Sequence, residues 1–171
     1  MVGVRYNLVM RKLILLRHAK SDWDDETLSD HDRPLAARGI RDAPRMGLLL
    51  AEKQLIPDLI ISSTACRART TAHAVAESGG FDARLMETES LYHSSPGQII
   101  SVLNREASDE SCVMLVGHNP GMEMLASSLA GSYQVFPTAA IGAFDCDVMD
   151  WGSFDLGDPV RLIGLWRPKE I

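Results

Sequence analysis

Three short hydrophobic blocks, separated by helical patterns, limit most strongly how this chain can fold. Leu13–Leu16, Leu59–Ser63 and Cys112–Val116 have the length of strands and begin with unbroken runs of apolar residues. A strand without polar alternation is covered on both of its faces, as in parallel sheets. Repeated alternation of such strands with helices predicts an α/β protein with three α/β/α layers and a mainly parallel central sheet.

The other elements follow from periodicity and from turn residues. Helices are predicted over residues 34–55, 65–77, 96–107 and 122–130, and further strands over 84–86, 139–144 and 160–166. Pro34 suits the first position of its helix, whereas Pro44 should kink or split the same helix. With 171 residues, 46% of them hydrophobic, the chain is expected to form one domain, with residues 1–11 as an N-terminal extension.

Composition excludes several classes of partner. The formal net charge of -6 argues against a nucleic-acid binder. The three cysteines form no CxxC pair and are expected to be reduced thiols. No apolar stretch reaches the length of a membrane span, and the first ten residues lack the features of a signal peptide. We therefore expect a cytoplasmic protein with neither nucleic acid nor membrane as a partner.

Basic residues gather where the three blocks end. Arg17 and His18 follow the first block, Arg67 follows the second within a Ser/Thr-rich segment, and His118 follows the third. The carboxyl ends of parallel strands meet at one edge of the sheet, which is where α/β proteins bind ligands. Guanidinium and imidazole groups together suit a phosphate or phosphoryl group. Lys20 and Ser21 are predicted as further contacts of this group because they lie beside His18.

These motifs resemble the histidine phosphatase (phosphoglycerate mutase-like) superfamily. Arg17-His18-Ala19 matches its Arg-His-Gly signature, Gly117-His118 matches its late Gly-His, and its Ser-x-x-x-Arg-Ala-x-x-Thr pattern is matched by Ser63, Arg67, Ala68 and Thr71. The run Arg-His-Ala-Lys-Ser is similar to the small SixA-type phosphohistidine phosphatase branch. The resemblance extends from Leu13 to Trp166 and implies a phosphoglycerate mutase-like fold.

The residues themselves predict a reaction at this edge. A neutral His18 ring would attack phosphorus and form a covalent phosphohistidine that water later hydrolyses. A backbone carbonyl would hold its other ring nitrogen. Arg17 and Arg67 would bind the phosphoryl oxygens, with His118 as a further donor. This metal-independent scheme needs no cofactor.

A proton donor for the leaving group is harder to identify. Glu87 and Glu89 are the nearest acidic residues, and Glu89 is the candidate donor, although neither lies in a clear motif. An imidazole leaving group, with an ordinary pKa of about 6.5, needs protonation far less than an alkoxide does. A phosphohistidine-bearing protein is therefore the favoured substrate. A small phosphate ester, or a non-catalytic module that binds phosphorylated ligands, remains as an alternative.

Several nearby polar residues are not assigned to the chemistry. The acidic segment from Asp22 to Asp32 lacks the glycine and the terminal glutamate of a calcium loop, so it predicts no metal site. His31 is interpreted as a loop residue, His93 as a turn residue, and His73 as a residue of a helix surface or of the core. Asp30 is interpreted as a partner of Arg33 that fixes the loop.

Overall fold

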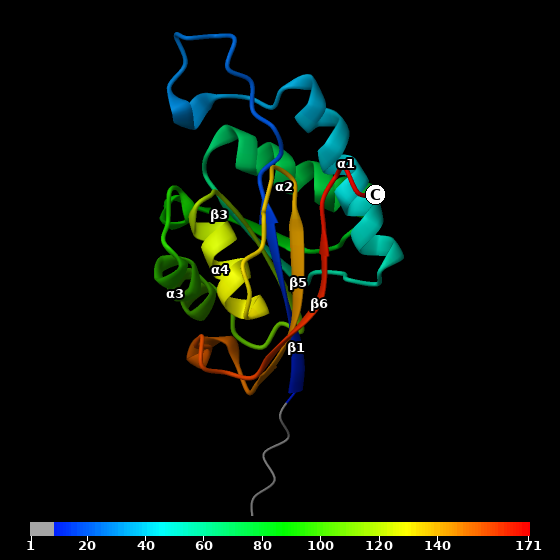
Figure 1. The fold of residues 1–171 in the computed structure, drawn as a ribbon, viewed down its shortest axis with the longest axis vertical. Coiled ribbons are helices and arrows are strands. Elements are labelled where there is room, and N and C mark those ends of the chain that lie inside the picture. The colour runs from blue at the N-terminus through cyan, green and yellow to red at the C-terminus, as the bar shows by residue number, and fades with distance from the viewer. Residues whose placement is uncertain (1–8) are drawn as a thin grey trace, which may run out of the picture.

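A six-stranded sheet forms the centre of the molecule. The computed structural model describes residues 9–171 (Figure 1). The strand order is β3-β2-β4-β1-β5-β6. The strands are β1 (Val9–Arg17), β2 (Leu59–Ser63), β3 (Arg84–Thr88), β4 (Cys112–Gly117), β5 (Ile141–Val148) and β6 (Val160–Trp166). The first four are parallel to one another, whereas β5 is antiparallel to β1 and β6 is antiparallel to β5. This is the predicted α/β fold with a mainly parallel sheet.

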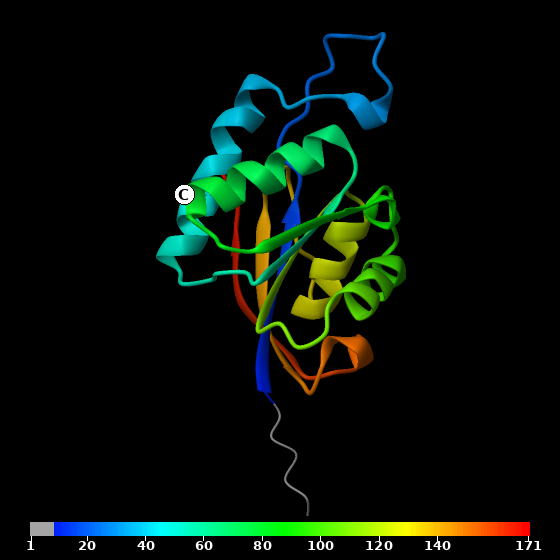
Figure 2. The ribbon, with the colours of Figure 1, turned by 180° about the vertical axis from the view of Figure 1, so that it is seen from behind.

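Two pairs of helices cover the two faces of this sheet. The helices are α1 (Ala37–Glu52), α2 (Cys66–Gly79), α3 (Pro96–Glu106) and α4 (Gly121–Ala130), with short 3-10 turns η1 (Asp30–Asp32), η2 (Glu89–Leu91) and η3 (Trp151–Ser153). α1 and α2 pack against one face, and α3 and α4 against the other (Figure 2). A hydrophobic core lies on each face of the sheet, and alternate residues of β1 pack into one core or the other. Leu13 faces α3 and α4, whereas Ile14 faces α1 and α2. The apolar blocks are therefore buried on both faces.

Local sequence explains where some helices start and stop. The Ser95 side chain and Gln98 form a capping box at the start of α3, and Pro96 occupies its first turn. Gly80 and Gly131 follow α2 and α4 in the left-handed conformation that glycine adopts without a steric penalty.

The first helix differs from the prediction at both prolines. α1 begins at Ala37 because the segment before it is extended: Leu35 pairs with Ser21 in an isolated bridge, and the Pro34 carbonyl accepts a hydrogen bond from the Asp22 amide at 2.8 Å. Pro44 lies inside α1, which continues past it without a break. The predicted helix start at Pro34 and the predicted split at Pro44 were both wrong.

The first strand is longer than the apolar block Leu13–Leu16 from which it was predicted. β1 begins at Val9 and pairs with β5 from there, so it includes residues 9–11 of the expected extension. The expected extension also included residues 1–8, which lie outside the described residues. Within residues 9–171, no helix combines the length and apolarity needed to cross a bilayer.

Candidate active site

The ends of three neighbouring strands bring the predicted basic residues together. β1 and β4 are paired so that Arg17 lies opposite Gly117, and the His18 amide donates to the Gly117 carbonyl at 3.0 Å. The rings of His18 and His118 consequently lie with their centroids 4.9 Å apart. Arg67 reaches the same place from the first turn of α2, directly after β2. All three side chains are buried.

The hydrogen bonds of His18 define which ring nitrogen can react. Its Nδ1 lies 2.8 Å from the carbonyl oxygen of Ala19, which can only accept, so Nδ1 carries the proton. Nε2 then carries the lone pair of the ring, toward which Arg67 Nε donates at 3.3 Å. The Ala19 amide is in turn held by the Thr71 hydroxyl at 3.0 Å. A backbone carbonyl thus holds the ring, and Nε2 is the nitrogen available for attack.

Burial keeps this imidazole neutral. Desolvation, reinforced by the nearby charges of Arg67 and Arg17, lowers the pKa of His18 from 6.5 to about 4, although the bond to Ala19 acts in the opposite direction. A protonated ring has no lone pair on Nε2, so the low pKa preserves a nucleophile at neutral pH.

Arg67 is hydrogen-bonded to several residues of the site. Its Nη2 donates to Asp30 Oδ2 at 2.9 Å and lies 3.4 Å from His118 Nδ1, and its Nη1 donates to the main-chain oxygen of Asp30. Because Arg67 can only donate, His118 Nδ1 accepts, and His118 Nε2 donates to the Ser63 hydroxyl at 2.8 Å. In this arrangement His118 has no spare N–H for a phosphoryl oxygen, in contrast to its expected role as a donor. Burial, with the nearby His18 and Arg67, lowers its pKa far below the ordinary value.

The Arg17 guanidinium is held by a main-chain carbonyl. Its Nη1 donates to the Phe136 carbonyl at 3.0 Å, an oxygen that also accepts from Asn119 at 2.9 Å. The Nε of Arg17 is buried and has no hydrogen-bond partner among residues 9–171. One edge of the guanidinium is therefore fixed while other donors stay available.

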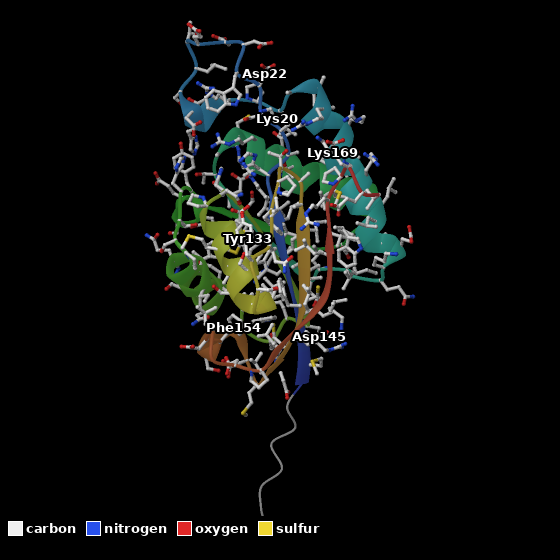
Figure 3. The ribbon with its side chains drawn as sticks, in the orientation of Figure 1. Lys20, Asp22, Tyr133, Asp145, Phe154 and Lys169 are labelled. Atoms are coloured by element: carbon white, nitrogen blue, oxygen red, sulfur yellow. The ribbon has the colours of Figure 1, made fainter. Side chains whose placement is uncertain are left out.

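The two predicted substrate contacts are placed differently from each other. Lys20 is exposed and Ser21 is buried. Figure 3 shows Lys20 at the upper end of the molecule, beside the loop that carries Asp22. The Lys20 main chain packs tightly on Gly39 of α1, where an added Cβ would lie 2.3 Å from the Lys20 oxygen. Within the described part of the chain, neither the Lys20 nor the Ser21 side chain is hydrogen-bonded to His18, Arg67 or His118. Their contact with substrate therefore stays a prediction.

Neither acidic candidate makes a side-chain hydrogen bond or ion pair with His18, Arg67 or His118 among residues 9–171, so the role of Glu89 as a proton donor stays a prediction. Glu89 is exposed on η2, and Glu87 faces Arg69 and His73 at 3.8 Å and 4.0 Å on the outer side of α2. Within residues 9–171, no group of three or more His, Cys, Asp or Glu residues is arranged to hold a metal ion.

Three residues of the candidate site, Asp30, Tyr92 and His93, were not assigned to it from the sequence. Asp30 Oδ2 accepts from Arg67, from the Tyr92 hydroxyl at 2.7 Å and from His93 Nε2 at 3.4 Å. Partial burial opposes ionisation, but the hydrogen bonds from Tyr92 and Arg67 prevail and hold the pKa of Asp30 well below its usual range. The rings of Tyr92 and His93 also pack beside His118.

The expected pairing of Asp30 with Arg33 was wrong. The turn η1 carries Asp30 over the start of α2, where Arg67 is within reach, while the Arg33 guanidinium stacks 3.6 Å above the Trp23 ring. The position of Tyr92 in the sequence could have predicted its place in the candidate site. It follows β3, and β3 ends beside Ser63 of β2 at the same edge of the sheet.

The low pKa of His18 has a measurable effect on stability. Below pH 6.5 the unfolded chain protonates this ring while the folded chain does not until about pH 4. The free energy of unfolding should therefore fall on acidification, by about 1.5 kcal/mol from His18 between pH 6.5 and pH 5. Urea unfolding at several pH values measures this, and His118 contributes in the same direction.

A His18→Asn variant isolates the contribution of this ring. Its free energy of unfolding should depend less steeply on pH than that of the wild type. Equal slopes in wild type and His18→Asn would contradict the lowered pKa.

Comparison with known proteins identifies the family of this chain. Residues 13–92 match the Histidine phosphatase superfamily (branch 1). An uncharacterized chloroplastic protein of Arabidopsis thaliana is 41% identical over 172 residues, covering 94% of this chain and 79% of the relative. The chain belongs to the histidine phosphatase superfamily.

Within this superfamily, solved SixA structures are similar over nearly the whole chain. SixA of Agrobacterium tumefaciens is 29% identical with a TM-score of 0.79, covering 92% of this chain and 98% of that protein. SixA of Nakamurella is 25% identical with a TM-score of 0.80, covering 93% and 96%. This histidine phosphatase superfamily protein thus has a SixA-like structure.

Proposed function

We propose that this protein is a phosphatase that acts through a covalent phosphohistidine on His18, and that its substrate is phosphohistidine in a protein. The observation that carries the proposal is the fixed, neutral His18 ring. Its Nδ1 proton is held by the Ala19 carbonyl, and its Nε2 lone pair lies at the Arg67 guanidinium. A residue needed only to bind phosphate would donate a proton at this position rather than present a lone pair.

The reaction proceeds in two displacements. His18 Nε2 attacks phosphorus, the bond from phosphorus to the substrate nitrogen breaks, and the departing imidazole takes up a proton from solvent water. Water then attacks the phosphorylated His18, which releases inorganic phosphate and restores the neutral ring. The N–H groups of Arg17 and Arg67 stabilise the charge on the phosphoryl oxygens in both steps. Arg67 already contacts the nucleophile, so it adjoins the oxygens of a group bonded there.

The carboxylates around the site favour a P–N bond as the one that is broken. Asp30 accepts three hydrogen bonds and stays ionised, so it is a poor proton donor, and Glu87 is directed to Arg69 and His73. An alkoxide leaving group requires a general acid nearby, whereas an imidazole needs protonation far less. Attack by His18 on phosphohistidine also exchanges one P–N bond for another. The two SixA relatives, whose suggested activity is that of a phosphohistidine phosphatase, support the same substrate class.

A substrate comparison tests the proposal. The purified protein would be given a protein phosphorylated on histidine with phosphoramidate and, separately, p-nitrophenyl phosphate and a set of sugar phosphates. We expect kcat/KM to be at least about tenfold higher on the phosphohistidine protein. Equal or higher values on the esters would overturn the substrate class. Trapping with labelled substrate should give acid-labile, base-stable label on His18, and label elsewhere would overturn the mechanism.

Asp30 is expected to act by positioning Arg67. In Asp30→Asn the charge-assisted bond to Arg67 Nη2 is lost while the size of the side chain is kept, so kcat should fall roughly tenfold. Steady-state kinetics measures the loss, and Tyr92→Phe, which removes a single hydroxyl donor to Asp30, should cost less.

Asp32→Asn is the matched control for Asp30→Asn. Asp32 lies on the same turn η1 and is exposed, with bonds only to Ser29 and His31 among the described residues. Its replacement should leave kcat unchanged. If both variants lose activity equally, the cause is a disturbed loop and Asp30 has no specific role.

A further inference from the structure

A second basic site lies beside the candidate active site, between α1, the loop before β5 and the C-terminal segment. It is a cavity of about 280 Å³, and five cationic side chains line it: Arg38, Arg41, Arg45, Arg167 and Lys169. The acidic side chains in its lining are those of Asp42 and Glu170. Five cations against two carboxylates give the lining an excess of positive charge, although the whole chain has a net charge of -6.

Three of these arginines come from one side of α1. Arg38, Arg41 and Arg45 are spaced three and four residues apart, which places them on the same helix face. The C-terminal segment that carries Lys169 lies against this helix in both ribbon views (Figures 1 and 2), and Arg45 donates to the main-chain oxygens of Pro168 and Ile171 at 3.3 Å and 2.7 Å. The cavity is therefore built from segments that are distant in the sequence.

The guanidinium groups are held in place but keep free donors. Arg38 Nη2 donates to the Thr138 hydroxyl at 3.3 Å, and Arg41 donates through Nε and Nη2 to the buried Asp42, both at 3.1 Å. Arg167 Nε donates to the Val135 carbonyl at 2.9 Å, and its Nη1 donates to the Glu170 carboxylate at 3.1 Å, which leaves its Nη2 without a partner among residues 9–171. An arginine has five N–H donors, so each of these groups has donors left for a ligand. Side chains already fixed by the protein lose less entropy when a ligand binds.

We propose that this cavity binds a small polyanion with two neighbouring phosphate groups, at a site separate from His18. Guanidinium groups match phosphate oxygens in pairs, and several of them around one hollow suit more than one phosphate. The volume lies near the lower end of small-molecule sites, which fits a diphosphate-sized group. Pro137 and Pro168 supply the apolar part of the wall. The proposal goes beyond the proposed phosphatase function and does not depend on it.

One loop borders both sites. Pro137 and Thr138 line the cavity, and the preceding Phe136 carbonyl accepts from Arg17 Nη1. The next residue, Ala139, donates its amide to the main-chain oxygens of Arg17 and His18, both at 3.1 Å. Ala139 has a φ of 61°, a left-handed conformation that is unfavourable for a residue with a Cβ. A ligand in the cavity would therefore contact the segment that holds Arg17.

Titration calorimetry with methylenediphosphonate tests the proposal, because its P–C–P link resists hydrolysis. We expect the wild type to bind two molecules, one in the cavity and one at His18. Arg67→Ala should lose the second event and keep the first. Arg38→Gln/Lys169→Gln, which neutralises two exposed cations of the cavity, should weaken the first event about tenfold and keep the second.

A control for total charge completes the experiment. Lys53→Gln/Arg105→Gln removes two exposed cations that lie outside the cavity lining, and it should leave both binding events unchanged. A single binding event that disappears in Arg67→Ala would overturn the proposal, as would equal weakening by the cavity variant and the control variant. The heat of binding does not depend on turnover, so failure of the phosphatase proposal leaves this result interpretable.

Discussion

His18→Ala should reduce turnover of a histidine-phosphorylated protein by more than about a thousandfold, because the atom that forms the covalent intermediate is gone. Arg17, Arg67 and His118 would remain in that variant, so phosphate could still bind while the reaction stops. Phosphate release measured under saturating substrate separates these two effects.

His73→Ala is the matched control, since it removes another histidine from an exposed position on α2. Its turnover should equal that of the wild type. A His18→Ala variant that is folded by circular dichroism and retains full turnover would refute the covalent scheme.

Arg67→Ala should lower kcat by two to three orders of magnitude, as expected for loss of a donor aimed at charge that develops in the transition state. The loss should be large because one guanidinium contacts His18, His118 and Asp30 at once. Arg67→Lys keeps the charge but not the planar fork, so it should recover little of the rate. Rapid-quench measurement of His18 phosphorylation would place the defect in the first displacement.

Arg69→Ala provides the comparison for Arg67. Arg69 lies two residues further along α2, is exposed and faces Glu87 at 3.8 Å. We expect its replacement to change kcat less than twofold. Similar losses at residues 67 and 69 would indicate damage to α2 and would remove the specific role of Arg67.

The strands and the meeting of the basic residues could be predicted because both depend on local patterns. Unbroken apolar runs such as Leu13–Leu16 have few alternatives to a doubly covered strand, and parallel strands bring their carboxyl ends to one edge. These patterns alone predict that Arg17, His18, Arg67 and His118 lie together. The carbonyl that holds the His18 ring was also expected, and the Ala19 oxygen is that carbonyl.

The features that could not be predicted depend on contacts between distant segments. α1 starts late because Leu35 is held by Ser21 across the loop, a pairing that no helix propensity contains. Asp30 reaches Arg67 rather than its neighbour Arg33 because η1 folds over α2. The proton position on His118 likewise follows from two partners, Ser63 and Arg67, that lie on other elements.

The place of β1 in the sheet has a consequence for how the protein loses activity. This strand is hydrogen-bonded to β4 on one side and to β5 on the other, and His18 follows its last residue. Interior strands of this kind exchange their amide hydrogens only when the whole domain opens, whereas loops and edge strands open on their own. The nucleophile is therefore attached to an interior strand rather than to a segment that opens on its own, and catalysis and the fold should disappear at the same denaturant concentration.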